Sequence, residues 1–211
     1  MGEKPILFST PLIQAILDGR KTQTRRVVKP QPPKHLEWGG WQIGGGKDSG
    51  KATWDNRGDG WLSTETHKVA TPYGNAGDEL WVRETWQAQT PSGKWWHEIP
   101  KGERPLHNWA VIDKATSDIK PPKWIPSVHI PRKFSRIQLC VKNVRVERVQ
   151  DISGDDVHKE GVTSHVHPTA SYFERAQREV FEALWDSINE KRGYSWQSNP
   201  WVWVVDFEVM R

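Results

Sequence analysis

The chain has little of what stabilises secreted domains or anchors membrane proteins. Cys140 is its only cysteine, which excludes an intrachain disulfide and a cysteine-based zinc site. No apolar run is long enough to span a bilayer, and the N-terminus carries no long apolar stretch. The sequence therefore predicts a cytoplasmic protein with no membrane partner.

Hydrophobic residues are also scarce for a chain of this length. They make up 35% of the 211 residues, and the mean hydropathy is −0.77. This composition predicts a single domain over 1–211 whose core is smaller than usual and carries polar insertions. We expect two irregular insertions, at about 30–76 and 87–125, the first with a hairpin near Trp54 and Trp61.

What the chain does contain is a mild excess of positive charge and many indole rings. Thirty Lys and Arg residues against 26 Asp and Glu residues give a net charge of +4. This balance permits a nucleic-acid or nucleotide partner, although a solvated basic surface explains it equally well. The 14 tryptophans are spread along the chain, and tryptophan either packs cores or stacks on nucleobases.

The hydrophobic pattern predicts more strand than helix. We expect Thr10 to cap the first helix, Gly19 to end it, and Ser153 to cap a second short helix. These elements predict a β-rich α+β fold, with a sheet curled towards a barrel and helices packed on it. The expected strands are 4–8, 24–28, 79–86, 136–149 and 201–210, and the expected helices are about 10–19, 153–161 and 171–193.

The most informative segment is residues 19–26, which follow the first helix and combine a lysine, two threonines and several arginines. A threonine hydroxyl such as that of Thr24 becomes a nucleophile only when a base takes its proton. Lys21 can be that base if burial and the neighbouring arginines lower its pKa. Glu160, at the end of the second helix, could orient Lys21 or protonate a leaving amine.

Two further segments carry charged residues, and each segment allows a structural and a functional interpretation. Arg83 and Glu84 lie in an apolar strand and face opposite sides of it, so at least one charge points inward. A buried ion pair and a polar site in a barrel mouth explain this equally well. His129 and Arg132 flank a rigid Ile-Pro turn, which is either a plain loop or a closure over an anionic or heteroaromatic ligand.

Two other patterns are weaker. Residues 45–52 begin like a phosphate-binding loop but end in alanine, and neither the preceding strand nor the following helix is evident. His158, His165 and His167 could form a metal cluster, but no carboxylate stands at a diagnostic spacing, so a solvated loop is favoured. We therefore expect neither a metal site nor a cofactor.

Three segments in order, 16–25, 77–84 and 156–161, resemble the signature of the ASCH family. The resemblance implies a PUA-like fold, a small β-barrel with flanking helices. The two insertions lie outside the minimal family domain. The Pro131-Arg132 turn and residues 199–203 are similar to the longer members common in phages and prophages.

The resemblance also implies an activity. Small bacterial members of the family are amidohydrolases that remove the acetyl group of N4-acetylcytidine with a lysine, a threonine and a glutamate, and these roles fall here on Lys21, Thr24 and Glu160. Other members bind RNA or are ribonucleases, so the partner is either a modified nucleoside or nucleotide, or RNA. The expected substrate-binding residues are Arg26, Arg83, Glu84, His129 and Arg132.

Overall fold

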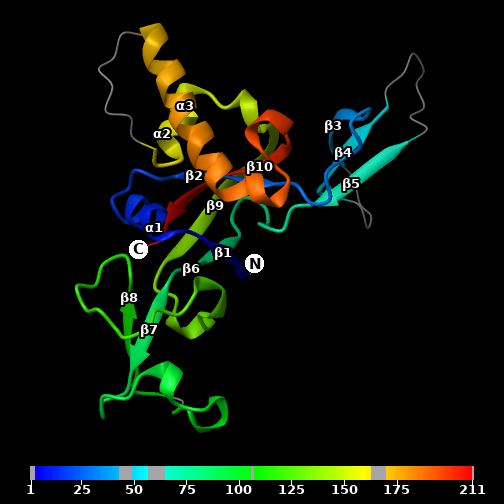
Figure 1. Ribbon diagram of the computed structural model, residues 1–211. Coiled ribbons are helices and arrows are strands. Elements are labelled where there is room, and N and C mark those ends of the chain that lie inside the picture. Colours follow the sequence, from blue (N-terminus) through cyan, green and yellow to red (C-terminus); the bar gives the residue numbers. More distant parts are fainter. Residues whose placement is uncertain (1–2, 43–48, 57–64, 106, 163–169, 211) are drawn as a thin grey trace.

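A computed structural model describes residues 3–42, 49–56, 65–105, 107–162 and 170–210. The fold is mixed α+β and rich in strand, and its centre is a five-stranded sheet in the order β1-β6-β9-β10-β2 (Figure 1). Its strands are β1 (Glu3–Leu7), β2 (Gln23–Val27), β6 (Glu79–Arg83), β9 (Gln138–Arg148) and β10 (Trp201–Val209).

The main sheet is open in the part of the chain that the structure describes. Strand β1 pairs with β6 in parallel, the other pairs are antiparallel, and β1 and β2 form the two edges. The edges are linked by a side chain, because the Arg26 guanidinium donates a hydrogen bond to the Leu7 carbonyl. The closed small barrel that we expected is therefore not found among these strands.

Three α-helices accompany the sheet: α1 (Thr10–Leu17), α2 (Gly154–Lys159) and α3 (Ala170–Asn189). Ser9, rather than Thr10, is the N-cap residue of α1, since Thr10 already has helical geometry. Gly19 has a φ of +74°, the left-handed conformation predicted for the residue that ends α1. Ser153 caps α2 as predicted, its hydroxyl accepting a hydrogen bond of 3.2 Å from the Asp156 N–H.

The expected strand over 79–86 is interrupted. Strand β6 ends at Arg83, and β7 (Trp86–Gln89) then pairs with β8 (Ala110–Asp113) in a separate two-stranded sheet. The break coincides with Glu84, which is buried and takes two hydrogen bonds from the Arg136 guanidinium. The long strand expected over 136–149 is β9, and its bulge is at Lys142, which the register with β10 skips.

Both insertions contain more regular structure than the sequence indicated. The first forms an antiparallel sheet of β3 (Glu37–Trp41), β4 (Lys51–Asp55) and β5 (Thr66–Ala70), called the first arm here. The hairpin expected at Trp54 is β4–β5, whereas Trp61 lies outside the described residues. Residues 45–48 of the phosphate-loop pattern also lie outside them, and a strand rather than a helix begins at Lys51.

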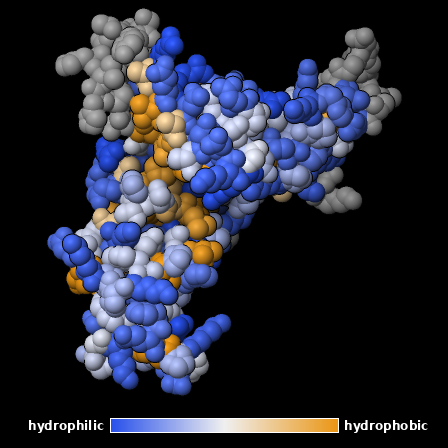
Figure 2. Space-filling view, in the orientation of Figure 1, coloured by the Kyte–Doolittle hydropathy of each residue, from blue (hydrophilic) through white to orange (hydrophobic). Residues whose placement is uncertain are grey.

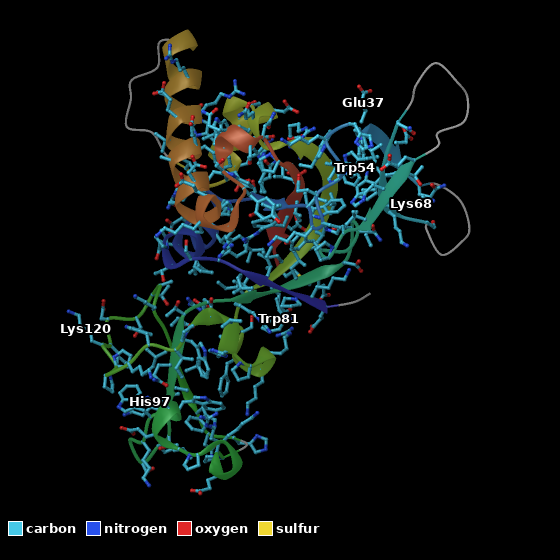
Figure 3. All side chains as sticks on the ribbon, turned by 45° about the vertical axis from the view of Figure 1, so that its right-hand side comes forward. Glu37, Trp54, Lys68, Trp81, His97 and Lys120 are labelled. Atoms are coloured by element: carbon cyan, nitrogen blue, oxygen red, sulfur yellow. The ribbon has the colours of Figure 1, made fainter. Side chains whose placement is uncertain are left out.

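Indole rings attach the first arm to the main sheet. Trp41 stacks on Trp203 with ring centroids 5.9 Å apart, and Trp54 meets Trp201 edge to face at 5.8 Å. The second arm, residues 86–125, packs Trp86 against Trp96 at 5.3 Å. Figure 3 shows Trp54 in the first arm, Trp81 near the junction with the second arm, and His97 and Lys120 further out on the second arm. Most described tryptophans are therefore structural.

Short 3₁₀ helices connect the remaining elements. Figure 2 shows apolar side chains gathered along α3 and towards the centre of this face. None of the helices in the described ranges has the length and apolar character needed to cross a membrane. The 3₁₀ segments are η1 (Trp96–Glu98), η2 (Lys101–Glu103), η3 (Ser127–His129), η4 (Arg132–Phe134), η5 (Val149–Asp151), η6 (Glu190–Arg192) and η7 (Trp196–Ser198).

Candidate active site

The turn between α1 and β2 lies against the C-terminal end of α2. The Thr22 N–H donates to the Lys159 carbonyl at 2.9 Å, and Lys21 and Glu160 form an antiparallel bridge. The Arg20 guanidinium adds a hydrogen bond of 3.3 Å to the Gly161 carbonyl. Two of the three segments that resemble the ASCH signature therefore meet here, whereas the third forms β6 in the main sheet.

Gly161 permits this close approach. Its φ is +80°, and a Cβ atom at this position would lie 2.9 Å from the Cβ atoms of both Ala15 and Lys21. Any larger residue would push α1 and the α1–β2 turn away from α2. The absence of a side chain at Gly161 is thus a condition for the contact between Lys21 and Glu160.

The Lys21 ammonium is buried and fully hydrogen-bonded. Its Nζ donates to Glu160 Oε2 at 2.6 Å, to the Gln23 carbonyl at 2.7 Å and to the Glu160 carbonyl at 2.8 Å. Burial lowers the pKa of Lys21, and the Glu160 carboxylate opposes that shift. Three donors and three acceptors match the protonated lysine, so Lys21 and Glu160 form a complete ion pair.

Behind this pair, Arg25 joins three carboxylates. Its guanidinium is fully buried and lies 3.5 Å from Glu160 Oε1, 2.8 Å from Asp156 Oδ2 and 3.0 Å from Glu147 Oε2. Burial opposes ionisation of Asp156, but the hydrogen bonds and charge of Arg25 outweigh it and lower the pKa of that carboxyl. Arg25 therefore lies near one oxygen of Glu160, Oε1, whereas Lys21 holds the other, Oε2.

Sequence reasoning missed this charged network. Arg145 extends it, with hydrogen bonds of 2.6 Å to Asp156 and 2.9 Å to Asp206, and it also contacts Glu147. Arg145 and Glu147 alternate along β9, which places both on one face of the sheet. That alternation of charges in a predicted strand was the available signal.

A cavity of about 310 Å³ lies along the outer edge of β2, between the sheet and α3. It is near the lower limit of the roughly 300–1,000 Å³ that is usual for small-molecule sites. Aromatic side chains form part of its wall, and Glu160 borders it. The lining residues are Leu12, Thr24, Arg25, Arg26, Val27, Lys29, Pro72, Tyr73, Glu160, Phe181, Leu184, Trp185, Ile188, Asn189, Arg192 and Trp203.

Thr24 lines this cavity together with Glu160, but it does not contact Lys21 through a hydrogen bond. Its side chain is buried, and its hydroxyl makes no hydrogen bond to any residue that the structure describes. Lys21 is not among the lining residues and lies behind Glu160. Glu160 is therefore the residue that both contacts Lys21 and shares the cavity lining with Thr24.

The backbone of β2 also faces the cavity. The Val28 N–H donates to Trp201 and the Thr22 carbonyl accepts from Phe207, so even-numbered residues of β2 direct their backbone groups towards β10. Odd-numbered residues then direct theirs outward, away from the sheet. The Arg25 side chain is fully buried, so this residue lines the cavity through its backbone. Together with Val27, it offers N–H and C=O groups to a planar polar ligand.

Arg26 shares the strand face of Thr24. Its guanidinium lies over the Phe8 ring at 4.9 Å, and its buried Nε has no hydrogen-bond partner among the described residues. Burial lowers the pKa of Arg26 and the charge of Arg192 adds to that shift, whereas Tyr73 and Glu160 only partly oppose it. Of the five predicted substrate-binding residues, Arg26 is the one that lines this cavity.

The other four predicted substrate-binding residues lie elsewhere. Arg83 stacks on the Trp81 ring at 4.7 Å, and Arg132 makes two hydrogen bonds of 2.7 Å to the Glu3 carboxylate. Glu84 forms the buried ion pair with Arg136, which was one of its two predicted readings. His129 is exposed in η3. None of these four is brought to the cavity beside Glu160.

The histidine cluster, the alternative to a solvated loop, falls largely outside the described residues. His158 is hydrogen-bonded to Gln177, and His165 and His167 lie outside the described part of the chain. The described residues also contain no group of three or more side chains suited to hold a metal ion.

The site thus combines a hydroxyl, a positioned carboxylate, outward backbone groups and a buried guanidinium around one small cavity. Such a set can bind a planar polar ligand and exchange a proton with it. Comparisons with protein-family models, with curated proteins and with solved structures find no match to this chain.

Proposed function

We propose that the protein is an amidohydrolase that acts on an N-acylated nucleoside or nucleotide similar to N4-acetylcytidine. One observation carries the proposal: Glu160, held by Lys21 at 2.6 Å, borders the same cavity as the Thr24 hydroxyl. These are the three residues that the ASCH resemblance assigns to catalysis. We also propose that the open sheet and its flanking helices belong to a PUA-like fold.

The geometry favours one division of roles among the three residues. Thr24 Oγ attacks the acyl carbon, and its proton passes to Glu160, whose carboxylate is the base nearest the cavity. The C–N bond then breaks, and Glu160 gives the proton to the departing amine. Water hydrolyses the acyl ester in the reverse sense, releasing the carboxylic acid and restoring the Thr24 hydroxyl.

Lys21 acts as a positioning residue in this scheme. All three of its ammonium protons are engaged, so it has no lone pair directed at Thr24. Its charge pairs with the Glu160 carboxylate, and its hydrogen bond holds that carboxylate beside the cavity. The base of the substrate would lie among the aromatic rings of Tyr73 and Trp185, with its polar edge on the backbone of β2.

The test is hydrolysis of N4-acetylcytidine, followed by chromatography of the released cytidine. We expect Thr24→Val and Glu160→Gln each to lower kcat by at least about a hundredfold, the usual scale for a lost nucleophile or acid–base group. Thr22→Val is the matched control, because Thr22 is exposed and does not line the cavity. A folded wild-type protein without turnover would refute the proposal.

A second candidate is a binding module that reads a modified base or RNA without chemistry. The complete ion pair of Lys21 favours it, since a fully satisfied lysine and carboxylate are also a structural unit. In that case Thr24→Val leaves ligand affinity and function unchanged, and binding weakens steeply with salt. A ribonuclease that pairs Lys21 with His129 has no comparable support, because His129 does not line the cavity.

A further inference from the structure

The cavity carries more positive than negative charge. Its charged lining residues are four cations and one carboxylate. The carboxylate, Glu160, and one cation, Arg25, already belong to the buried ion-pair network around Lys21. The remaining three, Arg26, Lys29 and Arg192, are called the cationic trio here. No salt bridge joins any of them to a carboxylate of a described residue.

Two members of the trio act on each other. The charge of Arg192, in η6 after α3, disfavours the charged form of Arg26, and Arg26 is held in β2 by its contacts with Leu7 and Phe8. Lys29 is also anchored, with its ammonium 5.2 Å from the Tyr194 ring centroid. Like charges gathered in a cavity and not engaged in salt bridges cost free energy that a bound anion would recover.

We infer that the cationic trio binds the phosphate monoester of the substrate, so that the ligand is a nucleoside monophosphate rather than a bare nucleoside. This inference rests on the proposed function for the reacting end of the ligand, at Thr24. Arg26 lines the cavity and forms no salt bridge with a described residue, so a bound phosphate would supply its counter-charge. The volume of about 310 Å³ lies at the lower end of the range for small-molecule sites, which favours one small ligand.

The experiment compares the binding of cytidine and of cytidine 5′-monophosphate by titration calorimetry. We expect the monophosphate to bind at least about tenfold more tightly, because guanidinium groups form charge-assisted hydrogen bonds with phosphate. Arg192→Met should reduce this preference to about twofold or less. Lys191→Met is the control, since Lys191 is the exposed neighbour of Arg192 and does not line the cavity. Equal affinities for the two ligands, or a preference that survives Arg192→Met, would overturn the inference.

A second arm identifies the source of the phosphate. A short RNA with a 5′-phosphate is titrated beside the free nucleotide, and the free nucleotide should bind more tightly because the cavity is small. Tighter binding of the RNA would overturn the assignment to a free nucleotide and move the phosphate to an RNA end.

The two proposals fail separately. Monophosphate binding that depends on Arg192, without hydrolysis of N4-acetylcytidine 5′-monophosphate, refutes the amidohydrolase and supports the phosphate site. Hydrolysis of the nucleoside and of its monophosphate with the same KM supports the amidohydrolase and refutes the phosphate site.

Discussion

Lys21 Nζ and Glu160 Oε2 lie 2.6 Å apart although 139 positions separate the two residues in the chain. The contact joins the turn after α1 to the end of α2, and a backbone bridge between the same residues reinforces it. Both side chains are almost completely buried, at 1% and 6% exposed. The pair therefore determines the position of Glu160 at the cavity, and the stability of this region depends on it.

Lys21→Met should destabilise the protein strongly. The change leaves the Glu160 carboxylate buried without its ammonium partner, and breaking a buried pair in this way costs about 3–5 kcal/mol. Urea unfolding measures the loss. Lys159→Met is the control, because the Lys159 side chain is 52% exposed and should contribute little. Equal effects of the two substitutions would show that the Lys21–Glu160 pair is not stabilising.

Arg25→Met tests the network on the other side of Glu160. Removing the guanidinium leaves Glu160, Asp156 and Glu147 without their shared cation, and we expect a loss of roughly 3 kcal/mol or more at pH 7. The loss should also depend on pH. In the wild type the folded-state pKa of Asp156 is below 3.8, so its contribution is present above pH 3.8 and disappears as the pH falls through the folded value.

The stability difference between wild type and Arg25→Met should therefore shrink when unfolding is measured at pH 3 instead of pH 7. Arg25→Lys restores a charge without the planar fork, and it should recover only part of the loss. A difference that stays constant with pH would mean that Arg25 acts through packing rather than through charge.

Gly161→Ala should be more harmful than Gly19→Ala, although both glycines have left-handed backbone geometry. The φ values are +80° and +74°, and a non-glycine residue in this conformation costs about 1–2 kcal/mol. An added Cβ meets Ala15 and Lys21 at 2.9 Å in the first case and nothing within 4 Å in the second. Gly19→Ala thus introduces backbone strain alone, whereas Gly161→Ala adds a steric clash with Ala15 and Lys21.

We expect Gly19→Ala to lose about 1 kcal/mol and to keep its activity, and Gly161→Ala to lose clearly more and to hydrolyse N4-acetylcytidine poorly. Thermal unfolding and the cytidine assay provide the two measurements. Similar losses in both variants would show that the α1–α2 contact adapts without cost.

Local signals predicted the frame of the site. Gly19 after an apolar helical stripe and Ser153 before two aspartates are short-range features, and the structure has both ends as expected. The contact of Lys21 with Glu160 rested on the resemblance, since no local rule brings these positions together. The structure shows that contact, whereas their catalytic roles stay a prediction.

Long-range pairing explains what the sequence could not predict. For Glu84 the sequence left a buried ion pair and a ligand site open, and it could not identify the partner, Arg136, which is 52 positions away. Arg132 was expected at the same site, but β1 brings Glu3 beside it. The first arm looked irregular because glycines interrupt its pattern, yet Trp41 and Trp54 bury their rings against β10. These outcomes depend on which strands become neighbours.

Asp113→Asn should stabilise the protein at neutral pH, and the gain should grow as the pH rises from 3.8 through 6. Burial, followed by the neighbouring Glu84 carboxylate, raises the pKa of Asp113 from 3.8 to about 6, although Arg136 lies 3.0 Å from it. The folded state therefore binds this proton more tightly than the unfolded state. The resulting stability is fully present below pH 3.8 and is lost as the pH rises through 6.

The variant carries no charge at this position at any pH, so it removes both the repulsion with Glu84 and the pH dependence. We expect a gain of about 1–2 kcal/mol at pH 7.5, allowing for solvent screening, and a clearly smaller gain at pH 4.5. Urea unfolding at the two pH values measures it, with the exposed Asp118→Asn as the control. A loss at both pH values would show instead that the attraction between Asp113 and Arg136 exceeds the repulsion between the two carboxylates.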